Sequence, residues 1–149
     1  MPHPIMFGDD DPGLAEVRAI ALGFPDAFEK VSWGRPVFCA PKMFAIYGGS
    51  VKGSAGNGVK GSVKGSVKGS AGSQYTQYPQ SVLVKVDDSD RNALQQDRRF
   101  FFPAYLGPFG WLGLDLTAAA VDWTEVTELI DASFRMVASK KLIARLDQR

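Results

Sequence analysis

The sequence has few of the residues on which metal and nucleophilic sites depend, with one cysteine, Cys39, and one histidine, His3. A single cysteine excludes an intramolecular disulfide. The apolar neighbours of Cys39, from 36 to 40, are typical of a buried, inert thiol. One Cys and one His cannot make a Cys/His zinc site, and a Ser–His or Cys–His nucleophile pair would have to use His3. We therefore predict no catalytic residue, no metal and no other cofactor, and we expect a protein that is not an enzyme.

Long apolar runs are also missing. None approaches the roughly 20 residues that a membrane-spanning helix needs, and the first residues, MPHPIMFGDDDPG, lack the basic and apolar regions of a secretory signal. With 149 residues and 45% hydrophobic content, the chain has the size and composition of one globular domain. We expect a cytoplasmic protein with no membrane partner, consisting of a single domain over 1–149.

Acidic residues are absent from one stretch, 50–73, in which the unit Val-Lys-Gly-Ser recurs. Its four lysines, Lys52, Lys60, Lys64 and Lys68, leave 13 basic and 16 acidic side chains for the other 125 residues. A body with a net charge of −3 supplies no long-range positive field, so attraction to a polyanion would come from this stretch or from a local patch. The stretch is interpreted either as a phosphate-binding arm or as a solvated loop inserted into the domain.

The sequence contains no complete form of three common ligand-binding motifs. Residues 56–61 match G-x-G-x-x-G, but no helical pattern follows them. Residues 88–92 begin like a calcium loop, yet Ala93 replaces the required glycine and Arg99 the bidentate glutamate. No G-K-[ST] loop occurs. The remaining acid–base candidates stand at the ends of expected elements, where capping or turn roles are favoured: Asp87, Asp115 and Asp122.

Periodicity and turn residues predict the order α-β-β-β-α-β-β-α. Val82, Val84 and Val86 alternate with Leu83 and Lys85, which indicates a strand with one buried face. The last long helix begins with the capping box Asp-x-x-Glu at 122–125. We expect an α+β fold of two layers, an antiparallel sheet of about five strands with helices on one face. The expected elements are helices over 12–22, 89–96 and from 122, a further turn or short helix from 139, and strands over 37–40, 43–47, 81–87, 100–105 and 111–116.

Several ordered motifs resemble the MmcQ/YjbR family of small bacterial proteins. The similarity covers most of the chain outside the first helix and the 50–73 stretch. It rests on Trp33-Gly34-x-Pro36, Lys42-Met43-Phe44-Ala45, the strand 83–87, Phe102-Pro103-Ala104-Tyr105-Leu106-Gly107, Gly110-Trp111 and Lys140-Lys141-Leu142. The resemblance implies the same two-layer fold, similar to secretion-chaperone-like domains, and a DNA-binding label without catalytic or base-reading residues. The insert at 50–73 departs from the short hairpin loop expected for the family.

Two functional classes follow. In the first, the protein contacts DNA phosphates weakly and without sequence preference, with bases stacked on Trp33, Tyr105, Phe109 or Trp111 unless these aromatic residues serve packing instead. In the second, a sheet face or edge binds a protein or peptide. The oligomeric state is left open. The residues predicted for nucleic-acid binding are Arg35, Lys42, Lys52, Lys60, Lys64, Lys68, Arg98, Arg99, Lys140 and Lys141.

The two interpretations of the 50–73 stretch make different predictions for binding to a generic DNA duplex. If the stretch is an arm, replacing it by a short turn lowers the salt slope by up to about 0.9 per lysine, about 3 to 4 in all, because fewer counterions are released. A salt titration of the intact and shortened proteins measures this change. An unchanged slope identifies the stretch as a loop without a role in binding.

Overall fold

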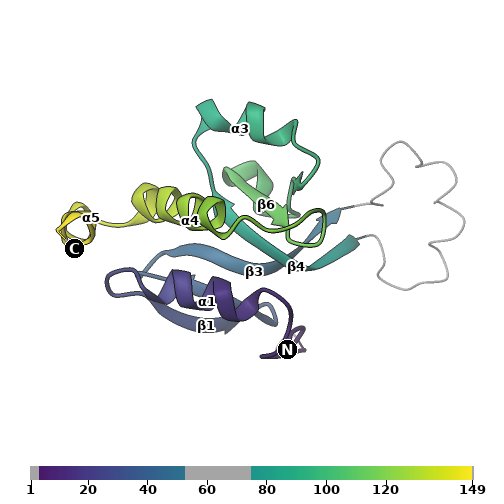
Figure 1. The fold of residues 1–149 in the computed structure, drawn as a ribbon, viewed down its shortest axis with the longest axis horizontal. Helices are drawn as coiled ribbons and strands as arrows, with labels where there is room; N and C mark the ends of the chain where they lie inside the picture. The colour runs from purple at the N-terminus through teal and green to yellow at the C-terminus, as the bar shows by residue number, and fades with distance from the viewer. Residues whose placement is uncertain (1–3, 53–74, 149) are drawn as a thin grey trace, which may run out of the picture.

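The computed structural model describes residues 4–52 and 75–148, whose elements form two layers (Figure 1). The strands make a six-stranded antiparallel sheet of order β1-β2-β3-β4-β6-β5. The predicted α+β class and order are confirmed, with one strand more than expected. The elements are α1 (Leu14–Leu22), β1 (Phe28–Ser32), β2 (Arg35–Cys39), β3 (Met43–Lys52), β4 (Tyr75–Lys85), α3 (Asp88–Gln95), β5 (Phe100–Phe101), the 3-10 turn η1 (Gly107–Phe109), β6 (Trp111–Asp115), α4 (Trp123–Val137) and α5 (Lys140–Asp147).

Helices α1 and α4 pack against the same face of the sheet, across β3 and β4 (Figure 1). Val82 and Val84 of β4, with Val86 just after it, belong to this core as the alternation predicts. Leu83 on the other face is also buried, at 3% exposure, so the prediction of a single buried face is wrong. At its centre, the rings of Phe44 and Phe134 meet edge to face, 5.2 Å between centroids. Burial of this apolar surface provides most of the driving force for joining the two layers.

The opposite face of the sheet carries a second, smaller apolar cluster. It contains Val37, Cys39, Ile46, Leu83 and Trp111. The predicted buried thiol is confirmed, because Cys39 is 1% exposed and its burial raises the pKa of the thiol. No helix of the described residues is long and apolar enough to cross a membrane.

The central hairpin is longer than predicted. The predicted strand 43–47 ends before Gly48, but β3 continues to Lys52, paired with β4 back to Tyr75. Gly48 has a φ of 95°, and the register shifts between Tyr47 and Gly49. A glycine in the left-handed region therefore forms a β-bulge here, after which pairing resumes, instead of ending the strand.

Other boundaries also differ from the prediction. Helix α1 begins at Leu14, after a left-handed Gly13, and not at Pro12. Strand β1 was missed because its apolar Phe28 and Val31 lie on an edge and remain half exposed, without a regular alternation. The strand expected over 100–105 ends at Phe101, since Pro103 cannot donate to the ladder.

A single hydroxyl joins α4 to the two central strands. The backbone N–H of Lys85 donates to Ser133 Oγ over 2.9 Å, and this hydroxyl donates to the Phe44 carbonyl over 2.6 Å. Ser133 is fully buried. Phe44 precedes Ala45 and Lys85 follows Val84, the last register pair at this end, so the hydroxyl links the strands where their pairing stops.

Replacing this hydroxyl should destabilise the protein. We expect Ser133→Ala to lower the free energy of unfolding by about 1–3 kcal/mol, because it leaves a partly buried N–H and a buried carbonyl without their partner. Urea unfolding at pH 7 measures the change. Thr127→Ala, which removes an exposed hydroxyl from the same helix, is the matched control and should change stability far less; equal losses would contradict the linking role.

Candidate functional site

A pocket of about 630 Å³ lies on the face of the sheet opposite α1 and α4. Strands β2, β3 and β4 supply its floor, which includes Ile46 and Leu83 of the second apolar cluster. One wall contains Met6 and Trp33, where the Met6 N–H donates to the Gly34 carbonyl over 2.8 Å. The other wall is the segment 103–106, held over β3 by the hydrogen bond from Ala104 N–H to the Ser50 carbonyl (2.7 Å).

Arg35 lies in the floor of this pocket and is 9% exposed. Its Nη2 donates to Gln77 Oε1 over 2.5 Å, and within the described residues it forms no ion pair. Gly48 makes room for it, since a Cβ at that position would collide with Arg35 Nη1. Burial lowers the pKa of the Arg35 guanidinium from its ordinary value, but an arginine remains charged at neutral pH. The pocket thus holds a buried positive charge.

The lining of the pocket contains no acidic residue in the part of the chain that the structure describes. Every buried side-chain nitrogen or oxygen there has a hydrogen-bond partner. Since the guanidinium bonds only to Gln77 among the described residues, its other nitrogens are not completely buried, and Arg35 is among the residues that line the pocket. These N–H groups form the planar fork that matches a phosphate or a carboxylate.

Aromatic side chains stand around the buried charge. Trp33 is 49% exposed and Tyr105 is 74% exposed. The rings of Tyr75 and Tyr105 lie 5.8 Å apart, with their hydroxyls 2.7 Å from each other. The hydrogen bond to Tyr75 raises the pKa of Tyr105, so this phenol is neutral at pH 7.

Trp33 and Tyr105 also share an unusual backbone conformation. Their φ angles are 55° and 68°, and in the described chain Asp26 is the third non-glycine residue with a positive φ. Such conformations cost of order 1–3 kcal/mol and occur often at ligand sites. Two of the three strained residues therefore lie in the walls of this pocket.

The other predicted basic residues occupy different places. Arg98, Lys140 and Lys141 are exposed, as are Lys42 and Lys52. Lys42 precedes β3 and Lys52 ends it, so roughly 30 Å of extended strand separates them. Lys60, Lys64 and Lys68 lie outside the described residues. The structure does not bring the described cations together into one patch.

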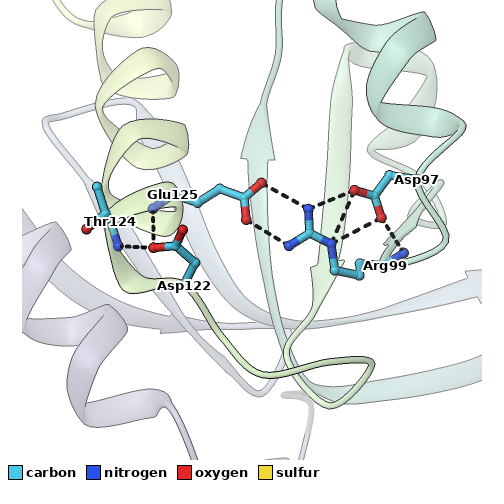
Figure 2. A network of polar contacts seen from close by, with 5 residues as sticks. All are labelled: Asp97, Arg99, Asp122, Thr124 and Glu125. Carbon is cyan, nitrogen blue, oxygen red and sulfur yellow. Dashed lines mark hydrogen bonds and ion pairs between the residues drawn. The ribbon is translucent and has the colours of Figure 1, made fainter.

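Arg99 forms ion pairs with two carboxylates of the fold. It donates to Asp97 and to Glu125, with a shortest distance of 2.7 Å in each pair, and thereby connects the start of β5 to the first turn of α4 (Figure 2). Glu125 does not complete the predicted capping box; Asp122 caps the helix by accepting from the N–H groups of Thr124 and Glu125. Among the described arginines, Arg35 and Arg98 are the two without an ion pair.

Sequence reasoning found part of the pocket. It named Arg35, Trp33 and Tyr105, but it also named Trp111, which is buried at 4% exposure, and Phe109, which lines a separate hollow with Arg91. It missed Tyr75, Gln77 and Gly48. The two glycines at 48 and 49, in the middle of an apolar strand, were the available signal, because glycine inside a strand often marks a bulge or a close approach.

The structure defines the class of the protein: a two-layer α+β protein with one sheet face that is concave and partly covered. Residues 22–136 match the family model YjbR, and the chain therefore belongs to the YjbR family, as the sequence motifs predicted. The structure is also similar to that of the Deinococcus radiodurans protein DR2400, which contains a DUF419 domain, with a TM-score of 0.57 and 17% identity over 86% of this chain and 80% of that chain. This likeness shows the fold alone. No curated protein gives a significant match.

The Arg99 network makes the free energy of unfolding depend on pH in the acidic range. Hydrogen bonds from Arg99 lower the pKa of Asp97, so the stabilisation is present above the ordinary Asp pKa of about 4 and is lost as pH falls through the lowered value. We expect Asp97→Asn to cost about 0.5–1 kcal/mol at pH 7 and less at pH 3. Urea unfolding at both pH values tests this. In an Arg99→Gln background the same substitution should have a smaller pH-dependent effect, because only the backbone N–H of residue 99 still donates to Asp97; an equal effect would contradict the pairing.

Proposed function

We propose that this YjbR protein is a non-enzymatic, cytoplasmic nucleic-acid-binding protein that holds single-stranded DNA weakly at the Arg35 pocket. The observation that carries this function is the guanidinium of Arg35, buried without a carboxylate partner among the described residues and open to the pocket. Leaving a buried charge unpaired is costly. An anionic ligand such as a backbone phosphate would remove that cost through charge-assisted hydrogen bonds.

The aromatic walls favour a single strand over a duplex. Bases stack on exposed aromatic side chains only when they have left the double helix, and each stacked base contributes about 1–3 kcal/mol. Trp33 and Tyr105 offer such faces beside the buried charge. A duplex could present only its backbone to this concave surface. Stacking and backbone contacts are tolerant of sequence, so little base preference is expected.

The chemistry of the pocket supports binding and not catalysis. Its described polar lining includes an arginine, an amide and two phenols, groups that donate hydrogen bonds at neutral pH. The net charge of the whole chain is +1, so non-specific electrostatic attraction is small and the affinity should be low.

A second candidate function, capture of an extended protein or peptide segment, is favoured by β1. This strand lies at the edge of the sheet, and its Phe28 and Val31 are 45% and 50% exposed. An edge strand with exposed apolar side chains accepts an added strand through backbone hydrogen bonds. Binding at β1 would not involve Arg35.

Binding of fluorescein-labelled oligo-dT tests the proposed function. We expect Arg35→Gln to weaken binding about tenfold, equivalent to about 1.4 kcal/mol, and to lower the salt slope by about 0.7, the value for one phosphate contact on a single strand. A duplex of equal length should bind less tightly. Fluorescence anisotropy at several salt concentrations measures both quantities.

Arg98→Gln is the matched control, because it removes the same charge from an exposed arginine without an ion pair in the described structure. Circular dichroism establishes that both variants are folded. Equal weakening by the two substitutions would refute a role for the pocket. No binding by the wild-type protein at low salt would refute the nucleic-acid function, and binding of an extended peptide would then support the β1 edge.

A further inference from the structure

We propose that the Arg35 pocket recognises a terminal phosphate monoester, such as the phosphorylated end of a DNA strand, in preference to the diesters within the strand. This inference rests on the proposed function and specifies its ligand.

The depth of Arg35 limits which phosphates can reach it. The side chain is 9% exposed and lies against the backbone of β3 at Gly48. An internal phosphate carries a sugar on each side, and both would have to enter between the wall at Trp33 and the wall at 103–106. A terminal phosphate carries one sugar, so it can enter with its free oxygens first.

The charge of the pocket also favours a monoester. A phosphate monoester carries about −1.5 to −2 charges at pH 7 and three acceptor oxygens, whereas a diester carries one charge. In the described chain no acidic side chain lines the pocket to compete for Arg35. Attraction to a partly buried cation grows with ligand charge and is little screened by water there.

The dimensions suit one nucleotide. Small-molecule sites have volumes of about 300–1,000 Å³, and this pocket, of about 630 Å³, is within that range. With the phosphate on Arg35, the attached base lies toward the exposed faces of Trp33 and Tyr105. A free nucleoside monophosphate has the same chemistry as the end of a strand, so the experiment has to distinguish these two sources.

Gln77 provides a variant that tests the ligand without removing Arg35. Its Oε1 already accepts from Arg35 Nη2, so Gln77→Glu places a carboxylate of the same shape beside the guanidinium. The new ion pair compensates the buried charge and competes with phosphate. The variant should therefore keep or raise the thermal midpoint while losing the preference for a monoester.

The experiment compares four labelled dT strands of equal length: 5′-phosphorylated, 3′-phosphorylated, unphosphorylated and circular. We expect one phosphorylated strand to bind wild-type protein about tenfold more tightly than the unphosphorylated and circular strands, and Gln77→Glu to abolish this difference. Unlabelled thymidine monophosphate is the competitor. If thymidine monophosphate displaces the phosphorylated strand and binds with an affinity similar to that of the strand, the proposal is supported with the free nucleotide as the ligand. If thymidine monophosphate does not displace the strand, the proposal is supported with the phosphorylated end of DNA as the ligand.

The outcomes separate this inference from the proposed function. Equal binding of all four strands would overturn recognition of the end while leaving single-strand binding intact. Tight binding of thymidine monophosphate without binding of any strand would support the monoester and overturn the nucleic-acid function. Absence of binding by all five probes would overturn both. A phosphate preference that persists in Gln77→Glu would show that Arg35 does not carry it, and would overturn the assignment.

Discussion

The hydroxyl of Ser133 bonds the helical layer to the sheet and, together with the apolar core, holds α4 on the face opposite the pocket. It bonds to the backbone of both β3 and β4, so α4 cannot slide along the strands without breaking buried hydrogen bonds. With α1 and α4 on one face, the N-terminal segment and residues 103–106 are the described segments that form the walls of the pocket on the other. Partial cover of a sheet face, and not an insertion into the core, produces the pocket.

Local signals in the sequence were sufficient for most of the secondary structure. The alternation in β4 and the caps Asp87, Asp122 and Ser139 depend on residues within a few positions of one another, and the structure has them as predicted. The edge strand and the β-bulge were harder to predict from the sequence. Strand β1 and the continuation of β3 past Gly48 depend on pairing with neighbours, which a single stretch of sequence does not reveal.

The pocket illustrates the same limit. Arg35 and Arg99 were both predicted to bind nucleic acid, and composition alone gave no reason to distinguish them. The fold supplies two carboxylates to Arg99 and a neutral amide, 42 residues away in the chain, to Arg35. Tertiary contacts therefore decide whether the guanidinium of an arginine is already paired with a carboxylate of the protein. This is why charge counts along the sequence could not distinguish Arg35 from the other nine candidates.

In the hairpin of β3 and β4, the described strand pairs that set the register are distinct from the segment of chain that connects the two strands. Pairing ends at Lys52 and Tyr75, and Tyr75 lines the pocket. The described strand pairs of this hairpin therefore lie entirely outside residues 53–74. In this chain, a reporter inserted between Lys52 and Tyr75 would be attached beside a residue of the pocket and outside the described strand pairs.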